Sequence, residues 1–413
     1  MTIDSWLVLV CVSRSFAMFM SMTYAGTLTV LRSEWAMSAT AAGSISSSFQ
    51  LGYAVSLVAF SVVADRLGAR RIFQWSLIAS AIAALAFAMF ARSYASGLVL
   101  YTLIAISQGG LYTTAIMLMS QRYPPEKRGG AVGWLIASSS AGYVMSLILC
   151  GIMLRHGGYP AAFLATAAGP VLSVIIAWPA LRATSNIVHS SAGQPRFGGA
   201  VFKNRPAMRL IIGYTGHSWE LLGMWAWIPA FLAASFAASG VGLVRAAELG
   251  AYSSASFHVM GVIASSSMGW LSDRIGARRI LISLASVSAA CSFFFGWLID
   301  FPTALVLGVG ALYAFTAIGD SPILSSTLTQ VVSAPSLGAA LGFRSLLGFG
   351  AGAVAPLAFG VVLDHVNALA GTRMAWGWAF VVLGLGGLVA IWAAVFVRIE
   401  GTRSQGARMI LSA

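Results

Sequence analysis

Charged residues are scarce in this chain. Asp, Glu, Lys and Arg together make up only 8% of its 413 residues, whereas hydrophobic residues make up 59%. A water-soluble domain carries roughly 25% charged residues, because its surface faces water. The shortage excludes an ordinary soluble globular protein and indicates a chain whose surroundings are lipid.

Cysteines and enzyme motifs are also few. Cys11, Cys150 and Cys291 all lie inside apolar stretches, where cysteine acts as a small buried hydrophobe, so we expect neither disulfides nor a metal site. The sequence has no Walker A loop, no nucleophile elbow and no cluster of metal ligands. We therefore expect neither an enzyme nor an ATP-driven pump, and no cofactor.

Long apolar runs fill most of the chain. A transmembrane helix needs about 20 apolar residues, and hydropathy gives twelve such runs. Their approximate bounds are 5–31, 41–64, 72–91, 95–120, 129–154, 160–181, 209–235, 246–271, 277–299, 303–328, 339–363 and 375–397. We predict an all-α membrane protein of twelve transmembrane helices. Two six-helix bundles, 1–181 and 209–397, would be joined by a linker at 182–208 and followed by a tail at 398–413.

The net charge of +13 is unevenly distributed. If the N-terminus lies inside, the inner loops and the C-terminal tail hold seventeen of the 24 Lys and Arg residues, whereas the outer loops hold five. Cytoplasmic loops carry such an excess, so both termini are predicted to be cytoplasmic. Because the basic residues lie in short loops between apolar runs, we expect no nucleic-acid partner.

A charged nonapeptide occurs twice. Residues 64–72 read ADRLGARRI and residues 272–280 read SDRIGARRI, a shift of 208 residues. A second motif, RYPPEKRGGAVG at 122–133, has a counterpart at 334–342 that has lost the charges. Each motif follows a corresponding apolar run of its half. The chain therefore consists of two similar halves.

This organisation resembles the major facilitator superfamily over the whole chain. The family's loop pattern, G-x-x-x-D-R-x-G-x-R-R, is matched from Gly269 to Arg279, whereas the first copy has Ser61 at the leading position. The resemblance implies a secondary active transporter that works by alternating access, with its site between the halves.

The resemblance also implies that the repeated loop latches the cytoplasmic ends together in the outward-open state. The gating residues of the first copy would be Asp65, Arg66, Gly68, Arg70 and Arg71, and those of the second would be Asp273, Arg274, Gly276, Arg278 and Arg279. The alternative is that the arginines only set topology, and the two roles are compatible.

Four charged residues fall well inside the apolar runs, away from the run ends: Arg14, Glu220, Asp320 and Arg344. A charge at the bilayer centre costs at least ~2.5 kcal/mol on insertion scales, so such residues are functional candidates. The resemblance implies that the first, fourth, seventh and tenth helices line the cavity, and three of the four lie on that set. We expect Arg14 and Glu220 to meet across the cavity, whereas Asp320 and Arg344 could simply form a structural pair.

Polar residues recur at matching positions of the halves. The shift of 208 relates Gln50 to His258 and Tyr112 to Asp320. Gln108 and Tyr112 share one helix face, as do His217 and Glu220. The tryptophans 219, 225 and 227 are interpreted as packing or lipid-anchoring residues rather than as a ligand cage. We predict that the substrate is bound by Arg14, Gln50, Gln108, Tyr112, His258 and Arg344, and that protons are carried by Glu220, Asp320 and His217.

Two transport hypotheses remain open, with a sensor as a third. The first is a proton-coupled porter of a small organic or inorganic anion, held by arginine, which binds carboxylates bidentately. The second is a proton-antiport exporter of apolar or cationic compounds, in which the acids bind the substrate. A non-transporting membrane sensor would usually need an extra soluble domain. The expected partners are a small-molecule substrate, protons and membrane lipid, for a monomer in the bacterial cytoplasmic (inner) membrane.

Overall fold

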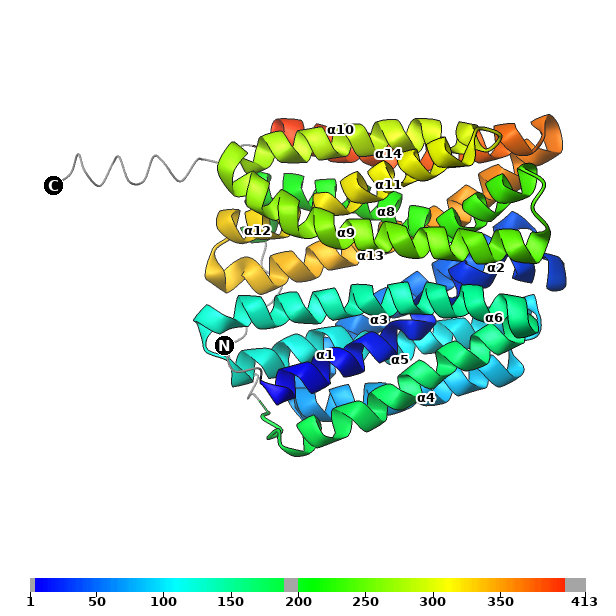
Figure 1. Ribbon diagram of the computed structural model, residues 1–413. Coiled ribbons are helices and arrows are strands. Elements are labelled where there is room, and N and C mark those ends of the chain that lie inside the picture. Colours follow the sequence, from blue (N-terminus) through cyan, green and yellow to red (C-terminus); the bar gives the residue numbers. More distant parts are fainter. Residues whose placement is uncertain (1–3, 189–199, 398–413) are drawn as a thin grey trace.

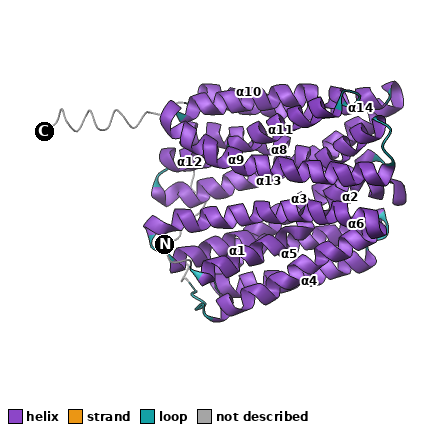
Figure 2. Ribbon diagram, in the orientation of Figure 1, coloured by secondary structure: helices purple, strands orange, loops and turns teal. Residues whose placement is uncertain are grey.

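The computed structural model describes residues 4–188 and 200–397. All regular elements in these ranges are helices, most of them long and roughly aligned with one another (Figures 1 and 2). The predicted all-α class is therefore confirmed. The predicted tail at 398–413 and the middle of the predicted linker, 189–199, lie outside the described residues.

The first helices form one group, which we call the N-group. Its elements are α1 (Ser5–Ala17), the 3-10 helix η1 (Met18–Ser21), α2 (Thr23–Glu34), α3 (Ala39–Leu67), α4 (Ala69–Phe90), α5 (Tyr94–Arg122) and α6 (Pro125–Arg182). At about 1.5 Å per residue, the 58 residues of α6 are far too long for one bilayer crossing. Non-helical backbone at Gly157 and Gly158, where φ of Gly158 is +66°, lets α6 turn back on itself (Figure 1).

The remaining helices form the C-group. Its elements are α7 (Ala200–Lys203), α8 (Arg205–Ala238), α9 (Leu243–Ile275), α10 (Ala277–Phe295), η2 (Gly296–Leu298), α11 (Thr303–Gly319), α12 (Ser321–Val331), α13 (Ala334–Ala370) and α14 (Thr372–Phe396). In the described part of the chain, ten helical segments are long and apolar enough to cross a membrane. The long α6 counts once among the ten, and α9 is not among them. The number of twelve crossings stays a prediction.

One membrane helix is broken near its middle. The stretch Ser5–Glu34 consists of α1, η1 and α2, and neighbouring side chains satisfy carbonyls beside the break. Gln108 Nε2 donates to the carbonyl of Ala17 at 3.0 Å, and the Tyr101 hydroxyl donates to that of Ser21 at 2.9 Å. Broken helices are tolerated at membrane depth only where such partners exist, and they commonly flank transporter sites.

The two groups meet differently at the two ends of the bundle. We call the end that holds Asp4 and Val397 the termini end, and the opposite end the far end. The largest apolar cluster draws residues from both groups, whereas the two next largest lie wholly within 6–181 and within 201–397. Likewise α2 packs on α8 and α9, whereas α1 packs closely only within the N-group. The groups therefore share a core toward the far end and have separate cores toward the termini end.

Candidate substrate site between the two helix groups

Arg14 lies at the end of α1, beside the helix break. Its side chain is buried, its Nε donates to Ser139 Oγ at 3.0 Å, and its guanidinium carbon lies 5.9 Å from the centre of the Tyr112 ring. One terminal nitrogen, Nη1, is buried and has no hydrogen-bond partner. No carboxylate forms an ion pair with Arg14 within the described residues. A buried cation thus keeps a free donor.

Arg344 of α13 presents a second cation from the C-group. Its guanidinium carbon stacks 3.8 Å from the centre of the Tyr214 ring, and its Nε is buried without a partner. The Tyr112 hydroxyl is close enough to Arg14, Arg344 and Tyr214 to interact electrostatically with all three. The structure therefore brings together three residues predicted to bind the substrate, Arg14, Tyr112 and Arg344, from both groups.

Asp320 pairs with His217 rather than with Arg344. The two lie 2.8 Å apart, from His217 Nδ1 to Asp320 Oδ1, and both are buried. Asp320 occupies the break between α11 and α12, and no ion pair joins it to Arg344 in the described part of the chain. The His217 ring also lies 5.6 Å from that of Tyr214. Tyr214 thus lies between the His217–Asp320 pair and Arg344.

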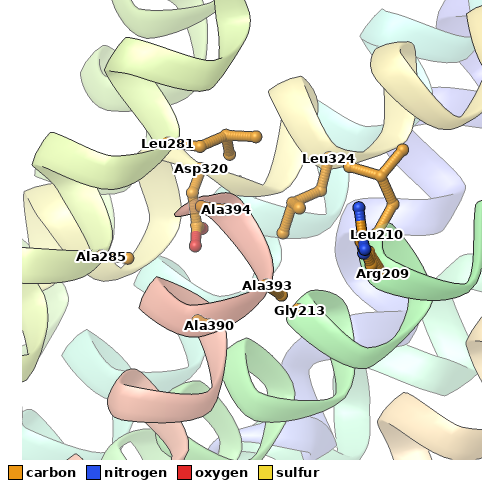
Figure 3. Close-up of a pocket in the computed structure, with 10 residues that line it drawn as sticks. All are labelled: Arg209, Leu210, Gly213, Leu281, Ala285, Asp320, Leu324, Ala390, Ala393 and Ala394. Carbon is orange, nitrogen blue, oxygen red and sulfur yellow. The ribbon is translucent and has the colours of Figure 1, made fainter. Parts of the chain in front are cut away.

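A narrow cavity leads to Asp320. Figure 3 shows the Asp320 carboxylate directed into this cavity, with Arg209 at its other edge. The cavity holds about 10 Å³, which is room for roughly one water molecule. Arg209 donates to the carbonyl of Phe396, at the end of α14. The cavity therefore lies between Asp320 and Arg209, a residue that contacts the end of α14.

Glu220 faces the interior of the C-group. Its Oε1 accepts a hydrogen bond of 2.9 Å from Ser288 on α10, and its Oε2 lies against Gly387 on α14, 2.9 Å from where a Cβ would stand. The expected meeting of Glu220 with Arg14 across the cavity is not seen. Helical spacing correctly groups Glu220 with the buried residues of α8 but does not reveal which neighbouring helix its carboxylate meets.

The other predicted substrate ligands have different surroundings. Gln108 is committed to the helix break, because it donates to Ala17 and accepts from Ser21 Oγ at 3.3 Å. Gln50 is half-buried on α3 and forms no hydrogen bond with the described part of the chain. His258 is buried on α9, stacked on Trp225 and facing Tyr143 of the N-group.

The repeated loop is built alike in its two copies but held differently. Gly68 and Gly276 follow α3 and α9 with φ of +91° and +103°. In the first copy, Asn186 Nδ2 donates to the carbonyl of Leu67 at 2.9 Å and Asn186 Oδ1 accepts from Arg71 N at 3.2 Å. In the second copy, Arg274 instead stacks on Trp270 at 3.8 Å.

No ion pair of Asp65 or Asp273 occurs within the described residues. The implied latch between the groups is therefore not made in this conformation, in which the cores are separate at that end. This agrees with a latch that closes only in the other conformation, but leaves its role a prediction.

The two glycines give a matched test of how the loop is held. Gly68→Ala is expected to destabilise the protein more than Gly276→Ala does. Both positions have a positive φ, which costs an alanine roughly 1 kcal/mol. Only at Gly68 would the added Cβ also clash with a neighbour, because it would lie 2.3 Å from Asn186. At Gly276 no atom lies within 4 Å. Melting temperatures in detergent measure the difference, and equal losses for the two variants would show that Asn186 gives way freely.

The far end is closed by a cap that joins the groups. Asp364 of α13 accepts hydrogen bonds from Ala39 N at 2.8 Å and Thr40 N at 2.7 Å, the first two residues of α3. Nearby, Leu357 N donates to Ser47 Oγ at 3.0 Å. A carboxylate at a helix N-terminus is favoured by the helix dipole. Sequence reasoning missed Asp364, because an acid near the end of an apolar run resembles a loop residue.

Comparison with known proteins now assigns the family. The family model described as the Major Facilitator Superfamily matches residues 10–356. The chain belongs to this family. It is 23% identical to the hexuronate transporter of Bacillus subtilis over 371 residues, which cover 83% of each chain. It is 22% identical to the niacin transporter NiaP of Acinetobacter baylyi over 384 residues, with 82% of this chain and 81% of that protein covered.

The fold agrees with this assignment. A bacterial homolog of the human lysosomal transporter Spinster, in an inward-facing and occupied conformation, superposes with a TM-score of 0.73 at 16% identity, covering 95% of both chains. The chain is thus a multi-pass integral membrane protein of a transporter family, and members of this family are not enzymes. The resemblance seen in the repeated loop is confirmed.

Proposed function

We propose that this chain is a proton-coupled porter of a small anion, organic or inorganic, in a bacterial cytoplasmic membrane. In this proposal the termini end is cytoplasmic, and the structure corresponds to the inward-facing state. One observation supports the assignment of a negative charge to the substrate. Arg14 and Arg344 belong to opposite groups and both lie near Tyr112. Neither has a carboxylate partner within the described residues, and each keeps a buried guanidinium nitrogen without a hydrogen bond.

A buried cation without a counter-ion is costly, and an anionic ligand supplies the missing partner. A guanidinium binds a carboxylate or oxyanion through parallel N–H donors. The names of the relatives support the same class, since hexuronate and niacin both carry a carboxylate. The alternative, an exporter whose acids bind a cation, has less support, because Asp320 contacts His217 and Glu220 contacts Ser288 inside the C-group.

The His217–Asp320 pair is the best-placed proton carrier. The small cavity lies beside Asp320 and is lined by Arg209, and Tyr214 lies between the pair and Arg344. Proton uptake by this pair would remove negative charge near Arg344 and so change how strongly that guanidinium attracts the substrate.

A ligand screen tests the charge of the substrate. The purified full-length protein would be heated with nicotinate, glucuronate, phosphate or tetraphenylphosphonium, because a ligand that binds the native state raises the melting temperature. We expect at least one anion to raise it and the cation to leave it unchanged. Stabilisation by the cation alone would overturn the proposal.

The coupling role of Asp320 gives a separate prediction. In proteoliposomes, Asp320→Asn is expected to lower accumulation driven by a pH gradient by at least about tenfold while leaving substrate counterflow, because the neutral amide cannot carry the proton. Glu220→Gln is the matched comparison, since that acid is also buried in the C-group but faces Ser288. If Glu220→Gln uncouples transport and Asp320→Asn does not, the carrier is Glu220.

A further inference from the structure

His258 carries an unexplained polar atom. Its ring stacks on Trp225 with 3.7 Å between ring centres and 13° between planes, and the residue is 5% exposed. The Nε2 atom is buried and forms no hydrogen bond. Native proteins rarely leave a buried polar group unpaired. If His258 served packing alone, an apolar ring would do so without this penalty, so the free nitrogen points to a ligand.

The surroundings of His258 place it near the anion site. Tyr143 of α6 faces it across the group boundary, with ring centres 5.5 Å apart. Ser139, which holds Arg14, precedes Tyr143 by four residues, so the two share one helix face and differ in depth by about 6 Å. The Arg14 charge also acts on the Tyr143 hydroxyl. Tyr143 is therefore near two residues with unpaired polar atoms, Arg14 Nη1 and His258 Nε2.

We propose that Trp225, His258 and Tyr143 form a subsite that selects an aromatic acid with a hydroxyl group or another hydrogen-bonding group opposite its carboxylate. This inference rests on the proposed function, because Arg14 holds the carboxylate. The ring then lies against Tyr143, and the far polar group pairs with His258 Nε2. A hydroxyl can donate or accept, so it satisfies either tautomer of His258. The stack on Trp225 fixes the plane in which His258 presents its nitrogen.

Three acids of similar size separate the contribution of the ligand's hydroxyl group to binding from that of its flat ring. Binding of 4-hydroxybenzoate, benzoate and cyclohexanecarboxylate to the purified full-length protein would be measured by isothermal titration calorimetry. We expect the hydroxylated acid to bind about tenfold more tightly than benzoate, which is the effect of one hydrogen bond to an otherwise unpaired group. Cyclohexanecarboxylate should bind more weakly than benzoate, because it lacks a flat face for Tyr143.

Variants assign the effect to His258. His258→Phe keeps a ring for Trp225 but loses Nε2, and should reduce the preference for 4-hydroxybenzoate to near unity while leaving benzoate affinity within about twofold. His258→Gln restores a hydrogen-bonding end and should recover part of the preference. His365→Phe is the control, since His365 is exposed on α13.

The outcomes distinguish this inference from the proposed function. If an anion of the ligand screen binds through Arg14 but none of the three acids does, the anion site stands and the aromatic subsite is overturned. If no anion binds in that screen either, or if binding does not depend on Arg14, the anion site itself is wrong. If all three acids bind through Arg14 with equal affinity in the wild-type protein, the anion site stands and the aromatic subsite is overturned. A preference for 4-hydroxybenzoate that survives His258→Phe would likewise overturn it, by showing that another residue reads the hydroxyl.

Discussion

Arg14→Gln is expected to weaken binding of the anionic substrate by about 30-fold to several thousand-fold. Removing one partner of a buried, hydrogen-bonded charge pair costs about 2–5 kcal/mol, and Arg14 is the buried cation on the N-group side of the site. Glutamine can still meet Ser139 but brings neither the charge nor the parallel donors. Calorimetric titration of the purified variant with the anion found in the ligand screen measures the loss.

Two companion variants separate charge from geometry. Arg14→Lys should recover part of the affinity, because a lysine restores the charge without the planar fork of donors. Arg92→Gln should bind as the wild type does, since Arg92 is exposed and donates to the carbonyls of Ala88 and Ala91. An Arg14→Gln protein that folds and still binds with wild-type affinity would remove Arg14 from the site.

The fold class could be predicted because it depends on properties averaged over the chain, such as the share of charged residues. A chain with 8% charged residues cannot cover itself with a water-facing surface, and the repeated loop predicts two similar halves. The breaks at η1 and at Asp320 could not be predicted in the same way. They are stabilised by side chains distant in sequence, such as Gln108 and Tyr101 at η1, which hydropathy does not register.

Sequence reasoning found candidate residues for the site but not their pairings. An ionisable residue in an apolar run is unusual whatever its partner, so Arg14, Arg344, His217 and Asp320 were recognisable. Helical spacing relates residues within one helix only. Whether Asp320 meets His217 or Arg344 depends on how α8, α11 and α13 cross, and this information lies in the packing.

Sequence reasoning also missed contacts between residues at the ends of the apolar runs, because the partners are distant in sequence. Asp4 pairs with Arg122 at 3.1 Å and accepts from the Tyr123 hydroxyl, joining the start of α1 to the end of α5. Burial raises the pKa of Asp4, but the hydrogen bonds from Arg122 and Tyr123 outweigh burial and hold that pKa below its usual value. In the sequence these residues look like ordinary loop charges, and only the fold brings them together.

Asp364→Ala is expected to shift the conformational equilibrium toward the state that is open at the far end, by about 100-fold or more. Hydrogen bonds to charged groups contribute about 1.5–3 kcal/mol each, and Asp364 accepts two from the N-terminus of α3, across the boundary between the groups. In an outward-open state these groups would separate, so their hydrogen bonds would favour only the closed far end. A ligand-free equilibrium moves by the energy difference between its two states.

Spin labels on both groups report this shift. Ala95 and Ala238 are exposed near the far ends of α5 and α8, and pulsed electron paramagnetic resonance between labels there would gain a longer distance in Asp364→Ala. Asp300→Asn is the matched control, because Asp300 is an exposed acid that lies 4.0 Å from Arg373 inside the C-group. The same distance distribution in Asp364→Ala and the wild type would show that the apolar core shared by the groups closes the far end without the cap. A longer distance in Asp364→Ala alone would identify the cap as the element that the substrate cycle must break and remake.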